Sequence, residues 1–275
     1  KYKGIWANMS RIKEKFAELS AKKEKALIAY IMVGYPNENA TMAAVRGLIK
    51  GGADIIELGF PFSDPLADGP VIQNASTVSL NNGTKINRFF NIVKKIRKET
   101  DIPLVLMTYT NILYHKGYSK FIAKAKNAGI DGFILPDMSI EESKEYIASA
   151  KNMADTIFLV SPNTTKSRIE KIANISSGFL YLVAVYGTTG VKTRIQNYSL
   201  KAIKDVKKIT GGKIPVGVGF GVSTPEDVKK YIKAGADAVI VGSAFLKLIK
   251  DTPQNKRESS IEAFTKSLKR QTVKK

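Results

Sequence analysis

Residues 57–70, ELGFPFSDPLADGP, contain the acidic side chains best placed to do chemistry. Glu57 lies within an apolar, strand-like run at 54–60. Burial disfavours the ionised form of a carboxyl group, so a glutamate in such a run is expected to have a raised pKa, which suits a general acid/base near neutral pH. A structural acid that caps a neighbouring loop is the alternative reading of Glu57, and its residue type leaves both readings open.

Two aspartates follow Glu57 in the same segment. Asp68 precedes an expected helix at 70–79, and the structural alternative to a catalytic role is an acid of that helix's N-terminal turn. Asp64 lies in the sequence Ser63-Asp64-Pro65, which is common in turns. Their chemistry alone does not rank one above the other as a catalytic group.

Three later segments are rich in small residues and follow strand-like runs. They are Tyr186-Gly187-Thr188-Thr189-Gly190, Gly219-Phe220-Gly221-Val222-Ser223 and Gly242-Ser243-Ala244. Backbone N–H groups and a short helix N-terminus bind phosphate at such strand ends in barrel enzymes. Tight turns need glycine too, but the adjacent strand ends favour a phosphate site.

Apolar and aromatic residues accompany these strand ends. They are Tyr30, Met107, Tyr109, Ile134, Leu159, Tyr181, Phe220 and Ile240. Some of them must belong to the barrel core. Together with a phosphate site they would also suit a flat apolar group on a phosphate ester.

The elements that must position these residues alternate along the chain. Strand-like runs lie at 27–34, 54–60, 103–109, 132–136, 156–161, 179–185, 215–220 and 238–242. Helix-like stretches with polar faces include 86–99, 118–128, 140–152, 197–209 and 225–234. Most strand-like runs are continuously apolar, which is typical of parallel strands covered by helices on both faces.

A short phrase recurs where a helix gives way to a strand: Gly52-Ala53-Asp54, Gly129-Ile130-Asp131 and Gly235-Ala236-Asp237. This repeated joint predicts βα units, and eight of them predict a single α/β domain over 1–275, a (β/α)8 TIM barrel with an additional N-terminal helix at about 9–23. A doubly wound open sheet is the alternative. Residues 1–8 are expected to be a disordered or non-native leader.

Composition excludes several classes of protein. The chain has no cysteine and a single histidine, His115, which argues against disulfides, thiolate chemistry, a Ser-His-Asp triad and a histidine-rich metal site. The lack of cysteine suits a cytoplasmic location, which is the expectation. No apolar run is long enough to form a transmembrane helix. The net charge of +20 comes from 44 basic against 24 acidic residues, and the basic residues are spread over nearly every helix, which favours a solvated basic surface over nucleic-acid binding. The same charge would attract an anionic substrate at low salt.

The segment 57–70, followed by Val71-Ile72-Gln73, resembles the signature of the tryptophan synthase α subunit. The small-residue segments above, Tyr109-Thr110-Asn111 and Pro136-Asp137 also match that family in order, so that the resemblance runs over 9–270. It implies a lyase that cleaves indole-3-glycerol phosphate to indole and glyceraldehyde 3-phosphate in tryptophan biosynthesis. It assigns the general acid/base to Glu57 and the acceptor of the indole N–H to Asp68.

The resemblance also implies the remaining site residues. Gly190, Gly221, Gly242 and Ser243 match the phosphate cradle, and Thr189 matches a threonine of the loop that closes over the site. The indole-pocket positions are Tyr30, Met107, Ile134, Leu159, Tyr181, Phe220 and Ile240. The chain departs from many members at Val185, where an arginine is common, and at Pro136, which replaces a small residue.

The resemblance implies a partner as well. The α subunit assembles with a pyridoxal-phosphate β subunit in an α2β2 complex and itself needs no cofactor. Its docking face would include Pro61, Phe62, Asp64 and Pro65. Two alternatives remain at this point: a barrel that mainly activates its β subunit, and another phosphate-ester barrel enzyme, although such enzymes typically carry a catalytic lysine on a strand.

Overall fold

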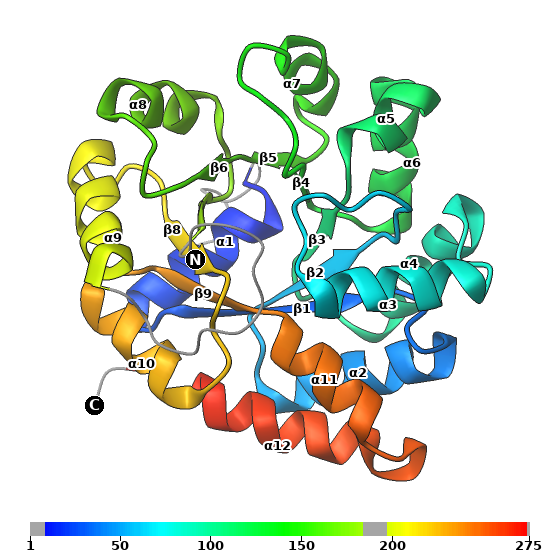
Figure 1. The fold of residues 1–275 in the computed structure, drawn as a ribbon. Helices are drawn as coiled ribbons and strands as arrows, with labels where there is room; N and C mark the ends of the chain where they lie inside the picture. The colour runs from blue at the N-terminus through cyan, green and yellow to red at the C-terminus, as the bar shows by residue number, and fades with distance from the viewer. Residues whose placement is uncertain (1–8, 184–196, 274–275) are drawn as a thin grey trace, which may run out of the picture.

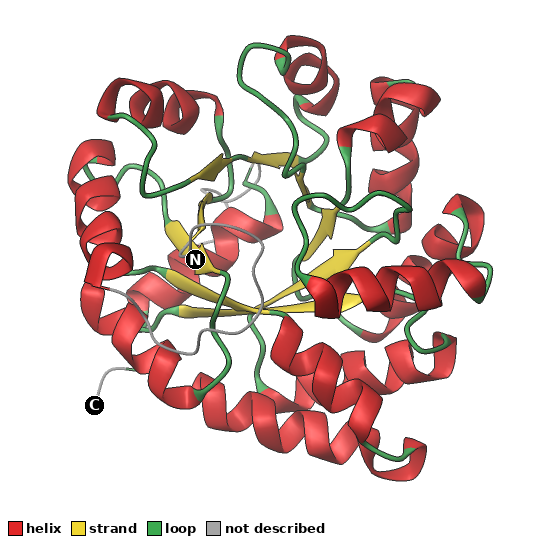
Figure 2. Cartoon of the chain, viewed as in Figure 1, coloured by secondary structure: helices red, strands yellow, loops and turns green. Residues whose placement is uncertain are grey.

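A ring of parallel strands surrounded by helices forms the molecule (Figure 1, Figure 2). The computed structural model describes residues 9–183 and 197–273. Its strands are β1 (Ala26–Met32), β2 (Ile55–Gly59), β3 (Leu104–Met107), β4 (Gly132–Ile134), β5 (Asp155–Ile157), β6 (Leu159–Val160), β7 (Leu180–Val183), β8 (Val216–Gly219) and β9 (Ala238–Val241). Nearly every strand residue is buried, as the continuous apolar runs predicted.

The strands are ordered β5-β4-β3-β2-β1-β9-β8-β7-β6, and all neighbours are parallel. The predicted fifth strand, 156–161, is divided: β5 pairs with β4 and β6 pairs with β7. Phe158 lies between them, and its carbonyl accepts a hydrogen bond from Tyr181 N–H at 3.0 Å. Because consecutive residues of one chain supply both edges of the sheet, the ring is nearly closed, and the predicted TIM barrel is confirmed.

The helices fill the connections between strands. They are α1 (Arg11–Ala21), α2 (Glu38–Gly51), α3 (Pro70–Asn81), α4 (Ile86–Glu99), α5 (Thr110–Lys116), α6 (Tyr118–Ala128), α7 (Lys144–Ala150), α8 (Lys166–Ile175), α9 (Asn197–Thr210), α10 (Pro225–Ala234), α11 (Ser243–Asp251), a 3-10 turn at Gln254–Lys256 and α12 (Arg257–Lys269). The prediction for α7 was too long, because 139–143 forms a turn in which the Ser143 hydroxyl donates to the Ile140 carbonyl.

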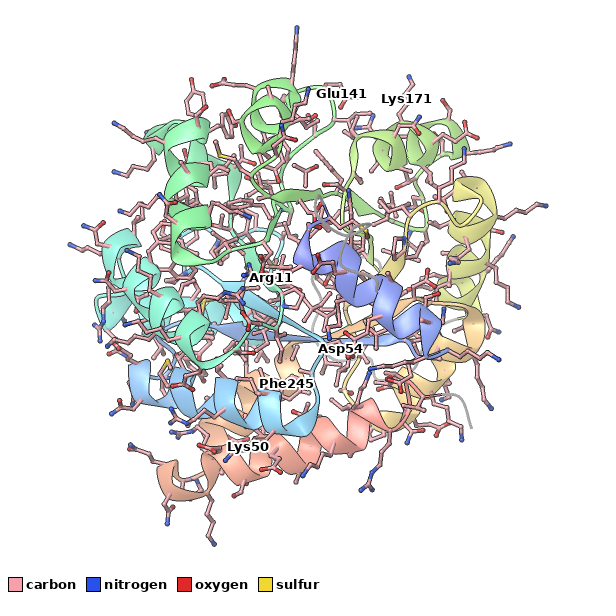
Figure 3. All side chains as sticks on the ribbon, turned by 180° about the vertical axis from the view of Figure 1, so that it is seen from behind. Arg11, Lys50, Asp54, Glu141, Lys171 and Phe245 are labelled. Atoms are coloured by element: carbon pink, nitrogen blue, oxygen red, sulfur yellow. The ribbon has the colours of Figure 1, made fainter. Side chains whose placement is uncertain are left out.

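The predicted N-terminal helix, α1, lies across the amino ends of the strands (Figure 1; seen from behind in Figure 3). Ile12 on α1 is fully buried and Phe16 packs against Phe179, with ring centroids 5.9 Å apart. Arg11 at its start forms a 2.9 Å ion pair with Asp131. This helix therefore covers the end of the barrel opposite to the loop that carries Asp68.

The repeated joint found in the sequence closes each helix with a left-handed glycine and then supplies an aspartate at the base of a strand. Each aspartate accepts a hydrogen bond from a backbone N–H group of the preceding strand. The pairs are Leu27 with Asp54, Leu104 with Asp131 and Val216 with Asp237. Each also binds basic side chains: Lys269 for Asp54, Arg11 and Arg97 for Asp131, Lys25 and Lys207 for Asp237. We call these three aspartates the basal aspartates.

Candidate active site

Glu57 lies on β2 with its side chain almost fully enclosed, at 1% exposure. Its Oε2 atom has no hydrogen-bond partner among the described residues. Burial, together with the nearby Asp68 carboxyl, raises the pKa of Glu57 to about 8. A carboxyl group that keeps its proton near neutral pH can donate it to a reacting atom and afterwards take one back.

Asp68 lies in the loop between β2 and α3 and is also buried, at 4% exposure. It does not cap α3, whose cap residue is Gly69. Its Oδ2 accepts a 3.0 Å hydrogen bond from the Tyr109 hydroxyl, which itself accepts one from Ala67 N–H at 3.1 Å. Oδ1 has no partner among the described residues, and burial raises the pKa of Asp68 to about 6 despite the Tyr109 hydrogen bond.

The loop that carries Asp68 is fastened to α3 by two side chains that the sequence did not reveal as site residues. The Ser76 hydroxyl accepts from Phe62 N–H at 2.8 Å and donates to the Phe62 carbonyl at 2.7 Å. The Gln73 amide donates to the Asp68 carbonyl at 3.0 Å. Phe62 stacks on Tyr109, with centroids 5.0 Å apart, so the loop is held from both sides. Ser76 and Gln73 look like ordinary helix residues in the sequence, and only the fold brings them to the loop.

Two tyrosines occupy space that glycines leave open. A Cβ added to Gly59 would lie 2.3 Å from the Tyr30 hydroxyl, and one added to Gly219 would lie 2.1 Å from the Tyr181 hydroxyl. Both tyrosines have pKa values raised well above the usual range, first by burial and then by the charges of Glu57 and Asp68. The two rings therefore lie within electrostatic range of the acids, and neither glycine tolerates a larger residue without movement.

The remaining predicted pocket residues gather at the same strand ends. Register places Met107 beside both Gly59 and Ile134, and Leu159 beside Tyr181. Phe220 directly follows β8, and its ring meets Tyr181 edge-on at 6.2 Å. Other predicted residues of this end are Ile240 on β9, Gly221, Gly242 as the cap residue of α11 and Ser243 as its first residue. Thr189 and Gly190 lie outside the described residues, as does Val185.

The predicted docking residues differ in exposure. Asp64 is exposed, Phe62 and Pro65 are partly buried, and Pro61 is buried. The most exposed large apolar side chain of the loop is Leu66, at 85% exposure, which the sequence reading did not single out. Neither exposure nor burial tests a role in docking, so these assignments stay predictions.

Other features of the described residues do not compete with this site. A surface hollow of about 760 Å³ lies among α1, α8 and α9, near the amino ends of the strands and away from both acids. Among residues 9–183 and 197–273 no group of histidine, cysteine or acidic side chains is arranged to hold a metal ion. No helix in the same ranges is long and apolar enough to cross a membrane.

Comparison with known proteins decides the family. A profile of the tryptophan synthase alpha chain family matches residues 16–274. The chain belongs to the tryptophan synthase alpha chain family. Its relatives in that family include the tryptophan synthase alpha chain of Methanosarcina barkeri, 47% identical over 260 residues that cover 94% of this chain and 96% of the relative. That of Carboxydothermus hydrogenoformans is 42% identical, covering 97% of this chain and 99% of the relative.

Solved structures of tryptophan synthase chains have the same fold as this protein. A chain of tryptophan synthase from Mycobacterium tuberculosis superimposes with a TM-score of 0.87 at 31% identity, covering 97% of this chain and 99% of that one. A chain of the tryptophan synthase α2β2 complex from Pyrococcus furiosus gives a TM-score of 0.81 at 38% identity, covering 89% and 98%. Both comparisons cover the described barrel almost completely.

Proposed function

We propose that this chain cleaves indole-3-glycerol phosphate to indole and glyceraldehyde 3-phosphate as the α subunit of tryptophan synthase. Membership of the alpha chain family supports the reaction. The observation that carries the proposal at the level of residues is the pair of buried acids, Glu57 and Asp68, each with an oxygen that lacks a partner among the described residues. Buried polar atoms are normally hydrogen-bonded, so a bound ligand is the natural partner for both.

The two acids divide the chemistry because their environments differ. Protonated Glu57 donates its proton to C3 of the indole ring, while the Asp68 carboxylate accepts the indole N–H and stabilises the cationic ring. The Glu57 carboxylate then takes the proton of the hydroxyl on C3′. The bond between C3 and C3′ breaks, its electron pair returns to the ring, and indole and the aldehyde are released. Each proton has a named donor and acceptor, and no cofactor takes part.

The phosphate group is proposed to bind across the barrel mouth from Glu57. Gly242 and Ser243 begin α11, and no side chain caps this end of the helix. Its free backbone N–H groups and the positive end of the helix dipole suit an anion. Gly221, and Thr189 with Gly190 outside the described residues, would complete the cradle. The pocket residues Tyr30, Met107, Tyr109, Ile134, Leu159, Tyr181, Phe220 and Ile240 are proposed to enclose the rest of the substrate.

A β subunit is the proposed partner, in an α2β2 assembly like the one named for the Pyrococcus furiosus relative. We propose that pyridoxal phosphate belongs to that β subunit and that this chain needs no cofactor. The docking face would include Pro61, Phe62, Asp64 and Pro65. The absence of cysteine fits a cytoplasmic location, which we also propose.

The two alternative functions find less support. None of the nine described strands contains a lysine, which weakens the reading as a lysine-dependent phosphate-ester barrel. Two buried acids with oxygens that lack a partner among the described residues cost stability, and a purely activating barrel would not need them.

The test is the substitution Glu57→Gln, which keeps the shape and removes the titrating group. Indole release from indole-3-glycerol phosphate should fall by at least about a hundredfold, the usual contribution of general acid–base catalysis. Glu145→Gln, at an exposed position on α7, is the matched control and should keep native turnover. Circular dichroism should show that both variants fold. Native indole release by the Glu57→Gln variant would refute the proposed function.

A further inference from the structure

The side chain of Tyr30 spans the distance between the two parts of the proposed site. A Cβ added to Gly242, at the start of α11, would lie 3.2 Å from Tyr30 Cδ1 and 3.4 Å from its Cβ. A Cβ added to Gly59, on β2, would lie 2.3 Å from the Tyr30 hydroxyl oxygen and 2.7 Å from Cζ. The near end of the ring therefore lies against the phosphate-cradle glycine, and its hydroxyl lies against the strand of Glu57.

The Tyr30 hydroxyl lies in the proposed site, close to the strand of Glu57. Within the described residues no hydrogen bond to it is found, although Tyr30 is only 4% exposed. Tyr30 and Glu57 are direct register partners on β1 and β2, so their side chains project on the same side of the sheet. Glu57 Oε2 and Asp68 Oδ1 are likewise unpartnered among the described residues. A ligand bound in the site is therefore expected to form hydrogen bonds with all three polar groups.

The glycerol chain of the substrate would lie between its phosphate and its indole ring. With phosphate at Gly242 and the reacting carbon C3′ at Glu57, that chain runs along the Tyr30 ring. Glu57 takes the proton of the C3′ hydroxyl in the proposed reaction, which leaves the hydroxyl of C2′ without an assigned partner. Tyr30 stays protonated at neutral pH because burial and the two acids raise its pKa, so it acts as a hydrogen-bond donor.

We propose that the Tyr30 hydroxyl donates a hydrogen bond to the C2′ hydroxyl of indole-3-glycerol phosphate and makes the site select substrates that carry this hydroxyl. The inference rests on the proposed function. Its physical basis is that a donor left unpaired in a buried site penalises any ligand that lacks the matching acceptor. Tyr30 is thereby a specificity-determining residue for the glycerol part of the substrate, in addition to its place in the apolar pocket.

Binding measurements on two ligands test the proposal. The variants are Glu57→Gln, chosen because its expected slow turnover leaves the ligand intact during the titration, and the same chain with Tyr30→Phe added. The ligands are indole-3-glycerol phosphate and its 2′-deoxy analogue, each titrated by calorimetry. Tyr30→Phe should weaken binding of the full substrate about tenfold, the value of one hydrogen bond, and change binding of the deoxy analogue by less than about twofold. An equal effect on both ligands, or no effect on either, would overturn the proposal.

Tyr146→Phe is the matched control, because the Tyr146 hydroxyl on α7 is also buried and without a partner among the described residues. Added to Glu57→Gln, it should leave both affinities unchanged; a loss equal to that of Tyr30→Phe would contradict the inference. The unsubstituted chain should itself prefer the full substrate to the deoxy analogue. This comparison does not depend on the fold of the Phe variant. If the native chain neither binds nor cleaves the full substrate, the proposed function fails, whereas native cleavage with an unaffected Tyr30→Phe variant refutes this inference alone.

Discussion

Glu57 and Asp68 release their protons over different pH ranges, which sets the expected pH dependence of the reaction. Asp68 ionises above its pKa of about 6, so activity should rise as the pH passes that value. Glu57 loses its proton above its pKa of about 8, so activity should fall there. We expect a bell-shaped profile of kcat/KM with its maximum between these values. A profile that stays flat from pH 5 to pH 9 would contradict the assignment of the two acids.

The same burial that prepares Glu57 for catalysis costs stability. Its pKa is about 8 in the folded chain against 4.5 for the unperturbed group. The folded state therefore holds more protons than the unfolded state between these values, and its stability falls as the pH rises through this window. Glu57→Gln removes this dependence, so the variant should melt at a higher temperature than the native chain at pH 8. The gain should shrink near pH 4, where both states are protonated; thermal unfolding at the two pH values measures it.

At the scale of elements, the basal aspartates tie neighbouring strands and helices together. Asp131 is 3% exposed and binds Arg97, Arg11 and the Leu104 N–H. Asp131→Ala leaves these donors without their acceptor and should lower the free energy of unfolding by about 3 kcal/mol, since removing one partner of a buried ion pair is costly. Urea unfolding measures this, and a single transition would also support the predicted single domain.

An exposed ion pair gives the control for that experiment. Glu141 on the turn before α7 pairs with Arg168 on α8, and both side chains are largely exposed. Glu141→Ala should therefore cost far less stability than Asp131→Ala, because solvent screens an exposed pair. Equal losses from Asp131→Ala and Glu141→Ala would show that the basal contacts add nothing beyond surface pairs.

The helix α10 offers a second measurement at this scale. The Thr224 hydroxyl accepts from Asp227 N–H, and the Asp227 carboxylate accepts from Thr224 N–H, which together form a capping box. Thr224→Ala should lower the free energy of unfolding by about 1 kcal/mol. Thr224→Asp keeps an acceptor and should retain most of the stability; the same loss in both variants would argue against the cap.

Local signals explain which elements could be predicted. The capping residues of α10 and the glycines that end α2 and α6 act within a few residues, so the sequence located those boundaries well. The break at Phe158 depends on pairing with two different strands and leaves no local mark. In the site, Glu57 stood out because a charge in an apolar run is unusual. The contacts of Ser76 with Phe62 and of Tyr109 with Asp68 join residues separated along the chain, and a single sequence does not contain them.

At the scale of the whole molecule, an exposed apolar side chain near the barrel mouth points outward beside the active site. Leu66 is 85% exposed, two residues before Asp68. If this loop docks on a β subunit, Leu66→Asp should weaken the association at least about tenfold, because a charge would be buried in the interface. The isolated chain should keep its own rate of indole release. Analytical ultracentrifugation with a tryptophan synthase β subunit measures the association.

Met153→Asp is the matched control, because Met153 is also exposed and apolar, at 38%, but follows α7 at the other side of the fold. It should leave the association unchanged. Equal binding by the Leu66 and Met153 variants would place the docking surface elsewhere.

The order of the strands affects how the chain folds while it is being synthesised on the ribosome. The first strand, β1, pairs with β2 on one side and with β9, the last strand, on the other. While the chain is being synthesised, β1 must keep one edge unpaired until residues 238–241 have emerged. The basal contact of Asp54 with Lys269 forms later still. Long-range pairing of this kind slows folding. The nascent chain therefore has an unpaired, aggregation-prone strand edge for most of its synthesis, and we expect chaperones to bind it during that time.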